Sequence, residues 1–512
     1  MIELSHRSKQ ILFLCCVPIV IGVFCALVYQ FRSWYLDDAF ISMRYARNVV
    51  EGKGLVFNVG EHVEGYTNFA WVMLLAMGFI AQLNVPFFAR AASIFFAVLT
   101  LFGVFMYLRA KYRRNPVFLL IILLLLASNG DFAAWSNSAM ETMMFTCFLF
   151  FGAITFDCRS YKPLFLSGFL LTMAMFARPE GCIPVVLFSA FTAVSSFIRT
   201  KNYRYSLLHA GSFLLPVLLL YAPYFFIRYN YYGYLFPNTF YAKVGNSILQ
   251  VMRGICYTAN FIFDYVFLIV PACFGYIFFF KRYFHFVLLI LFYMGYVVYV
   301  GGDPFPAYRF LIPLSPFIYI GYFFFICKIY SRLKLHAVRR LLPVCIGITF
   351  VVQVMQVWYR HDFLRLYADD VTRVGRKIGM WIKEYLPSDT VIALNAVGAV
   401  PYYSRLKTID MLGLTDEYLA HNNSKKGGGL AGHELGDGSY VLSRQPDIIV
   451  FSGPWGHELP LFKGDYDLYA NPLFFEKYLF YTLPIQDIIF CCYVRKDNRY
   501  LVAVLDDFLS RL

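Results

Sequence analysis

Two adjacent aspartates, Asp37 and Asp38, directly follow the first long apolar segment of the chain. Carboxylates at the exit of a membrane segment are costly and tend to be functional, as general bases or as ligands of a hard cation such as Mg²⁺, Mn²⁺ or Ca²⁺. The structural alternative is a solvated loop start, or an N-cap for a helix predicted over residues 39–50, since Asp is favoured there. The residue types alone leave both interpretations open, and nothing in the sequence requires a metal.

Four basic residues near the ends of apolar segments are candidates for binding an anionic group. Charge-assisted hydrogen bonds from Arg and Lys suit phosphate oxygens. Such side chains also extend to lipid headgroups without any further role. The four are Arg44, Arg178, Lys243 and Arg309.

Seven further side chains could hydrogen-bond the hydroxyl groups of a substrate. Each also has a structural alternative, as a helix cap, a loop contact or an inert surface residue. The seven are Glu64, Tyr66, Thr67, Asn68, Glu141, Glu180 and His433.

The elements that carry these residues are set by composition. The chain has 512 residues, of which 60% are hydrophobic, 20% aromatic and only 15% charged. Apolar runs long enough to cross a membrane recur from residue 11 to about residue 358,. The net charge of +14 lies in short basic clusters between these runs, as in the cytoplasmic loops of membrane proteins, so it does not indicate nucleic-acid binding,. The sequence predicts a polytopic α-helical membrane protein.

Charge also predicts the topology. If every apolar segment crossed, the basic cluster from Arg109 to Arg114 would lie outside, against the positive-inside rule,. If residues 69–83 lie in the interface or re-enter, every basic loop falls inside, which leaves about eleven spans with a cytoplasmic N-terminus and a retained first helix. The segments are 11–31, 69–83, 88–108, 116–129, 140–156, 163–177, 183–198, 207–228, 262–280, 284–300, 309–328 and 341–358.

Two domains follow from this pattern. Residues 1–358 form the transmembrane domain, with a first outer loop over 32–87, and residues 359–512 form a soluble extracytoplasmic α/β domain. The second domain should contain strands at 390–394 and 447–451 and an amphipathic helix over 369–386. The twelve cysteines show no disulfide or zinc spacing, and there is no internal repeat of the kind that many transporters have,.

Residues 37–69 (DDAFISMRYARNVVEGKGLVFNVGEHVEGYTNF) resemble the first periplasmic loop of the GT-C glycosyltransferases, and more narrowly that of the terminal β-(1→2)-arabinofuranosyltransferase family. Two departures, Pro304-Phe305 where the family has Trp-Met and the glycine run 427–429, bear on the sugar and acceptor rather than on the reaction class. Further similar motifs follow in order along nearly the whole chain, at residues 139–142, 177–181, 236–243, 301–309, 398–404, 409–416 and 432–434.

The resemblance implies a GT-C-like fold and transfer of a sugar, which is arabinofuranose in the family it resembles, from a polyprenyl-phosphate donor to an envelope glycan or glycolipid on the extracytoplasmic side of the inner membrane. It implies that the aspartate pair supplies the base, with Asp37 the expected base and Asp38 orienting or contacting the acceptor. The cations above would bind the donor phosphate, and the polar residues would bind the sugar or acceptor. No cofactor is required by the sequence.

Two other functions compete with this interpretation. A lipid-linked-sugar flippase or transporter would keep ionisable groups inside its helices near the bilayer midplane, whereas the predicted spans are almost free of charge,. An oligosaccharide ligase that uses a polyprenyl diphosphate is closer in chemistry, and the residues alone do not exclude it.

Overall fold

The computed structural model describes residues 6–112, 116–245, 247–332, 336–421 and 429–511. The chain divides into two compact units, and each is made of segments that are far apart in sequence. Unit 1 comprises Met1–Trp34, Arg90–Phe226 and Gly254–Leu364, and unit 2 comprises Tyr35–Ala89, Ile227–Arg253 and Arg365–Leu512.

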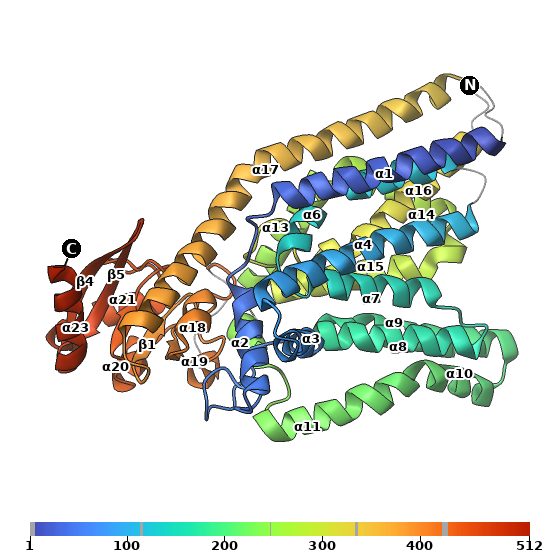
Figure 1. Ribbon diagram of the computed structural model, residues 1–512. Coiled ribbons are helices and arrows are strands. Elements are labelled where there is room, and N and C mark those ends of the chain that lie inside the picture. The colour runs from blue at the N-terminus through green and yellow to red at the C-terminus, as the bar shows by residue number, and fades with distance from the viewer. Residues whose placement is uncertain (1–5, 113–115, 246, 333–335, 422–428, 512) are drawn as a thin grey trace. The chain divides into compact units, whose positions relative to one another are not determined.

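Unit 1 is helical. In Figure 1 its helices α7, α8 and α9 run side by side, and α10 packs against both α8 and α9. Four helices (α4, α11, α13 and α17) continue along the chain into unit 2. The helices are α1 (His6–Gln30), α4 (Val85–Lys111), α5 (Pro116–Ala127), α6 (Gly130–Asn137), α7 (Thr142–Thr155), α8 (Tyr161–Ala177), α9 (Cys182–Thr200), α10 (Tyr203–Pro216), α11 (Ala222–Tyr232), α13 (Ile248–Asp264), α14 (Val266–Phe278), α15 (Phe280–Val300), α16 (Ser315–Arg332) and α17 (His336–Tyr385), with short turns η1 (Pro179–Gly181), η2 (Val217–Tyr221) and η3 (Ile312–Leu314).

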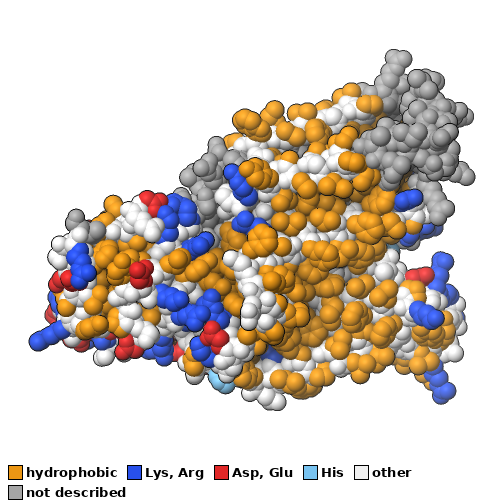
Figure 2. Space-filling model, viewed as in Figure 1, with side chains coloured by type: hydrophobic (Ala, Val, Ile, Leu, Met, Phe, Trp, Pro, Cys, Tyr) orange, Lys and Arg blue, Asp and Glu red, His pale blue; other side chains and the backbone are white. Residues whose placement is uncertain are grey.

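Six helices in the described part of the chain are long and apolar enough to cross a membrane, or up to eight if each of two bent pairs is one span. The bends are 55° between α5 and α6 and 90° between α13 and α14. Shorter apolar helices lie at Val17–Gln30, Phe69–Ile80, Thr142–Thr155 and Tyr161–Ala177. Hydrophobic side chains cover the visible face over these helices (Figure 2), as expected where lipid replaces water,. The chain is a membrane protein.

Close helix packing in unit 1 depends on glycine. Helices α14 and α16 pack on each other where Gly275 faces Gly321, and a Cβ added to Gly275 would lie 1.9 Å from the carbonyl oxygen of Gly321. Small residues allow this approach because helices in lipid associate through van der Waals packing rather than through exclusion of water.

Unit 2 contains one five-stranded sheet and short helices. The strand order is β2-β1-β3-β5-β4, with β1 parallel to β2 and β3, and β5 antiparallel to β3 and β4. The strands are β1 (Val391–Leu394), β2 (Lys407–Asp410), β3 (Ile448–Val450), β4 (Tyr478–Ile485) and β5 (Ile488–Arg495), and the helices are α2 (Asp38–Val50), α3 (Phe69–Ile80), α12 (Asn238–Lys243), α18 (Ala399–Ser404), α19 (Glu417–His421), α20 (Gly438–Ser443), α21 (Lys463–Tyr469), α22 (Pro472–Lys477) and α23 (Arg499–Ser510).

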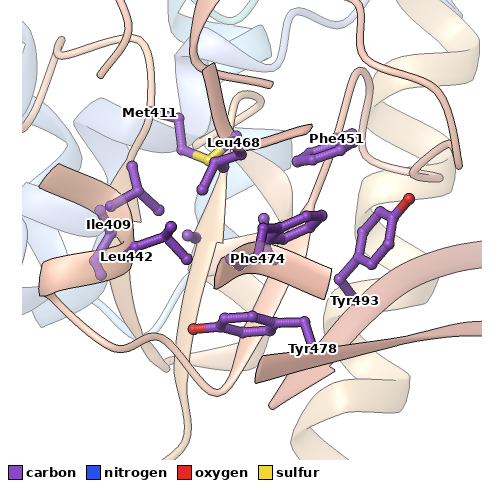
Figure 3. Close-up of a cluster of buried hydrophobic side chains, with 11 residues drawn as sticks. Ile409, Met411, Leu442, Phe451, Leu468, Phe474, Tyr478 and Tyr493 are labelled. Atoms are coloured by element: carbon purple, nitrogen blue, oxygen red, sulfur yellow. The ribbon is translucent and has the colours of Figure 1, made fainter. Parts of the chain in front are cut away.

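A cluster of buried hydrophobic side chains, aliphatic and aromatic, forms the core next to this sheet (Figure 3). Phe474 stacks on Tyr478 with ring centroids 5.5 Å apart and also contacts Tyr493 on β5 and Phe451 just after β3. Burial of such rings contributes much of the stability of a small α/β unit.

The predicted local elements are confirmed where the pattern was strong. The helix predicted over 39–50 is α2, the two predicted strands are β1 and β3, and the amphipathic segment 369–386 forms the end of α17. Position 359 lies inside α17, which runs unbroken from His336 to Tyr385.

Candidate functional site

Asp37 lies just before α2, but its carboxylate does not cap that helix. The backbone N–H groups of Gly398 and Ala399, at the start of α18, donate to its two oxygens at 2.9 and 2.7 Å. Burial raises the pKa of Asp37 to about 7; the Ala399 and Gly398 amides act against this, and the charge of Asp38 adds to it,. Asp37 therefore joins the first loop to the C-terminal segment within unit 2.

Asp38 is the first residue of α2 and is partly exposed. Within the residues that the structure describes, its carboxylate makes no hydrogen bond or ion pair, and its electrostatic partners are Asp37 and His433. Both of its oxygens are thus open to a ligand, unlike those of its neighbour.

Lys243 and His433 lie together in the same unit. Lys243 is the last residue of α12, and its side chain passes over Gly432, where an added Cβ would lie 3.1 Å from the Lys243 Cε atom. Burial lowers the pKa of His433, and the charge of Lys243 adds to this effect, whereas Asp38 and Glu434 oppose it,. Lys243 therefore lies next to the 432–433 segment, and the charges of Lys243 and Asp38 both act on the His433 imidazole.

Arg44 has a different environment from the one expected of a phosphate ligand. Its guanidinium donates to the carbonyl oxygens of Phe57, Pro401 and Leu406 at 2.8 Å each and to the Asn58 side chain at 3.1 Å. Its side chain is buried, and this burial lowers its pKa to about 9. Arg44 holds the first loop and the segment after α18 together.

Three of the polar residues at 64–68 have partners within unit 2. Glu64 forms a buried ion pair with Arg228 at 2.6 Å, and burial raises the pKa of Glu64 to about 7 although Arg228 opposes the shift. Tyr66 packs edge-on against Tyr45, and Asn68 exchanges hydrogen bonds with Ser42. Thr67 is half-buried.

Four predicted site residues lie in unit 1. Arg178 bridges Glu141 and Glu180 at 2.9 and 2.5 Å, and all three are buried. Arg309 pairs with Asp303 at 2.7 Å. The Phe310 ring centre lies 5.1 Å from the Arg309 guanidinium and 4.9 Å from the Arg178 guanidinium. These two arginines flank one ring, and each has its own carboxylate partners.

The candidates therefore fall into two groups. Unit 2 contains Asp37, Asp38, Arg44, Glu64, Tyr66, Thr67, Asn68, Lys243 and His433, and unit 1 contains Glu141, Arg178, Glu180 and Arg309. Within the described ranges no group of three or more His, Cys, Asp or Glu side chains is arranged to hold a metal ion.

Sequence reasoning missed several buried charges. Arg228 and Asp303 are the ion-pair partners of predicted residues, and Asp410 accepts hydrogen bonds from the backbone of Leu412, Gly413 and Thr415. Burial raises the pKa of Asp410 to about 6. Asp410 could have been found from its place in the segment 409–416, which resembles a motif of the glycosyltransferase family. Arg228 ends the apolar segment 207–228, and nothing in that segment indicates its ion-pair partner.

A family described as a domain of unknown function (DUF8728) matches residues 362–500. The terminal β-(1→2)-arabinofuranosyltransferase of Mycobacterium tuberculosis is 28% identical over 251 residues, which are 45% of this chain and 38% of that protein. The Corynebacterium glutamicum protein of the same name is 28% identical over 257 residues, 43% of this chain and 35% of its own. The chain thus spans well under half the length of these relatives.

The fold is similar to that of ArnT from Cupriavidus metallidurans. The crystal structure of ArnT bound to undecaprenyl phosphate matches with a TM-score of 0.55 at 12% identity, over 79% of this chain and 86% of that one. The apo crystal structure matches with a TM-score of 0.54 at 11% identity over the same shares. The chain therefore has the fold of ArnT and is similar in sequence to two proteins named terminal β-(1→2)-arabinofuranosyltransferase.

Proposed function

We propose that this protein is a glycosyltransferase that moves a sugar from a polyprenyl-phosphate donor to an envelope glycan or glycolipid. The observation that carries the proposal is the convergence of Asp38, Lys243 and His433 from three distant segments of unit 2. The ArnT structure with undecaprenyl phosphate supports a lipid-linked donor, and the names of the sequence relatives support arabinofuranose as the sugar.

Asp38 is assigned the role of general base. The acceptor hydroxyl oxygen forms a bond to the anomeric carbon, its proton passes to the Asp38 carboxylate, and the bond from that carbon to the phosphate oxygen breaks with its electron pair on the phosphate. The hydrogen bonds of Asp37 favour a positioning role, because both of its oxygens already accept backbone N–H groups. This reverses the order of the two aspartates that the sequence favoured.

Lys243 is assigned to the donor phosphate. A cation next to the leaving oxygen stabilises the charge that develops as the glycosidic bond breaks. Lys243 is chosen because its charge, like that of Asp38, acts on His433. Arg44 is held by buried carbonyl groups, and Arg178 and Arg309 are held by carboxylates. Thr67 and His433 are assigned to the sugar or acceptor, and Glu64, Tyr66, Asn68, Glu141 and Glu180 to the support of the surrounding fold.

The proposal includes the topology predicted from charge. Eleven spans, an N-terminus in the cytoplasm and an extracytoplasmic segment from residue 359 would put unit 2 on the outer side of the inner membrane. The grouping of α3 with unit 2 supports its exclusion from the spans. Cysteine labelling tests this: with exposed native cysteines replaced, Ala110→Cys should be protected from an impermeant reagent and Ser439→Cys should react. The opposite pattern would contradict the orientation.

The activity is tested with the full chain reconstituted in nanodiscs. Polyprenyl-phosphate donors that carry arabinofuranose, other pentoses and hexoses are incubated with a short neutral glycan acceptor, and the product is identified by mass. Transfer from a monophosphate donor supports the proposal. Transfer only from a diphosphate-linked oligosaccharide, or movement of the donor across the bilayer of sealed proteoliposomes without transfer, contradicts it.

A further inference from the structure

An open cleft of about 770 Å³ lies in unit 2, apart from the aspartate pair. Its walls come from four segments of the chain: residues 60–63 of the first loop, Tyr234 after α11, residues between 416 and 421 at α19, and Tyr440 and Arg444 at α20. None of Asp37, Asp38, Lys243 and His433 lines it. The candidate base and phosphate partner therefore do not account for this cleft.

Aromatic rings form two stacked pairs in the walls of the cleft. Tyr418 stacks on Tyr440 with ring centroids 4.2 Å apart and planes at 20°, and Tyr234 stacks on His421 at 4.3 Å and 23°. Tyr418 is 51% exposed, although stacking against Tyr440 holds its ring in place. Flat rings presented to solvent offer faces for the C–H groups of a sugar ring.

The polar groups between the rings are ordered by hydrogen bonds. Arg444 donates to the Tyr440 hydroxyl at 2.6 Å and to the Glu61 carboxylate at 3.2 Å. The Tyr440 hydroxyl donates to Asp416 at 2.9 Å, and the Tyr234 hydroxyl donates to Glu417 at 2.5 Å. Each carboxylate has further lone pairs that accept hydroxyl groups, and the arginine has further N–H donors.

The charge of the lining decides the class of ligand. The cleft has three carboxylates (Glu61, Asp416 and Glu417) and one arginine, which already pairs with Glu61. This balance disfavours phosphate or any other anion, and the polar lining disfavours a lipid chain. Carboxylates and an arginine between aromatic faces match a ligand rich in hydroxyl groups and without charge.

We propose that this cleft binds a neutral oligosaccharide, namely the part of the acceptor glycan away from the hydroxyl that reacts. The assignment of the bound glycan as acceptor rests on the proposed function, whereas glycan binding itself does not. A cleft of this kind selects acceptors by length, because a short acceptor that occupies the reacting position does not extend into the cleft.

Direct binding is the first test. The full chain in nanodiscs is titrated by calorimetry with a linear oligomer of arabinofuranose, with a monosaccharide glycoside, and with an anionic oligomer of galacturonate. Tyr418→Ala and Glu417→Gln are compared with Tyr500→Ala, a 68% exposed tyrosine on α23 that does not line the cleft. Exposed substitutions of this kind rarely disturb folding, and thermal unfolding of each variant checks this.

The neutral oligomer should bind more tightly than the other two ligands. Tyr418→Ala and Glu417→Gln should each weaken its binding at least about fivefold, close to 1 kcal/mol, while Tyr500→Ala leaves it unchanged. In the transfer assay the same two variants should raise KM for the oligomer without changing kcat, and should leave the monosaccharide acceptor unaffected. Unchanged affinity in both cleft variants, or tighter binding of the galacturonate oligomer, overturns the proposal.

The two proposals fail in different ways. If the wild-type protein binds the neutral oligomer but transfers no sugar from any donor, the proposed function fails and glycan binding by the cleft stands. If the wild-type protein transfers sugar and the cleft variants keep the wild-type KM for the oligomer, the assignment of the cleft fails and the proposed function stands.

Discussion

The Asp37 carboxylate lies 2.7 Å from the backbone nitrogen of Ala399, a residue 362 positions further along the chain. The neighbouring Gly398 has no side chain in the way: a Cβ there would lie 2.5 Å from the Asp37 carboxylate and 2.0 Å from its carbonyl oxygen. The glycine is therefore needed for the backbone of α18 to approach the aspartate so closely.

Gly398→Ala is expected to displace Asp37 without altering any acidic or basic side chain. The clash should cost about 1–3 kcal/mol of stability, as overpacking usually does, and should lower turnover because the adjoining Asp38 moves with it. Turnover and the apparent unfolding temperature are measured together. Gly211→Ala is the matched control, since nothing lies within 4 Å of a Cβ at that glycine. Wild-type turnover in Gly398→Ala would contradict the positioning role of Asp37.

Lys243→Met is expected to weaken donor use while the fold survives. Methionine keeps the apolar part of the side chain over Gly432 but removes the charge, so kcat/KM for the lipid-linked donor should fall about 10²–10³-fold,. Lys243→Arg keeps the charge and should recover part of the loss. Lys463→Met removes an exposed lysine that pairs with Asp467 on α21 and serves as the control. An unchanged kcat/KM in Lys243→Met would remove Lys243 from the site.

Arg44→Met is expected to act on stability rather than on donor binding. Its guanidinium satisfies four buried acceptors, and hydrogen bonds from a charged donor contribute about 1.5–3 kcal/mol each, so the loss should exceed about 3 kcal/mol,. Lysine at this position should not restore it, because one ammonium does not reach all four groups. Arg405→Met, which removes an exposed ion pair to Glu51, should cost at most about 1 kcal/mol,. A stable Arg44→Met variant with a raised KM for the donor would instead indicate a phosphate ligand.

The stability of unit 2 is expected to increase as the pH falls from 8 toward 5. Burial raises the pKa values of Asp37, Glu64 and Asp410 to about 7, 7 and 6, whereas carboxyl groups in the unfolded chain ionise near pH 4,. Between these values the folded state holds more protons than the unfolded state, so acid favours folding. The pKa of His433 is lowered, so this residue makes acid less favourable to folding, but it is one group against the three carboxyl groups.

The measurement is the apparent unfolding temperature of the detergent-solubilised protein at a series of pH values. It should rise from pH 8 to about pH 5, and the slope should be smaller in Glu64→Gln, which has one such carboxyl group fewer. A steady decrease from pH 8 to pH 6 would contradict the raised pKa values.

Much of the fold could be predicted because the strong patterns are local. Apolar length identified apolar helices in unit 1, and short continuous runs of buried, β-branched composition identified β1 and β3. The partners of the buried charges could not be predicted, because nothing near Arg44 in sequence indicates the carbonyl oxygens of Pro401 and Leu406. For the same reason the sequence favoured Asp37 as the base, since the two backbone amides that engage its oxygens come from a segment that is remote along the chain.

The cleft could not be predicted from the sequence. Its tyrosines at 234, 418 and 440 come from three segments, and each is an ordinary residue in its own surroundings. Only their stacking in space makes them a candidate site.

Replacement of each aspartate separately tests the central claim most directly. Wild type, Asp37→Asn and Asp38→Asn are compared in nanodiscs over a range of polyprenyl-phosphate-sugar concentrations up to saturation, with the unfolding temperature of each recorded. Asp38→Asn should lose at least about 10²-fold in turnover with an unchanged unfolding temperature and donor KM, as removal of a general base does, and Asp37→Asn should lose less turnover but more stability. Near-wild-type turnover in Asp38→Asn would contradict the account.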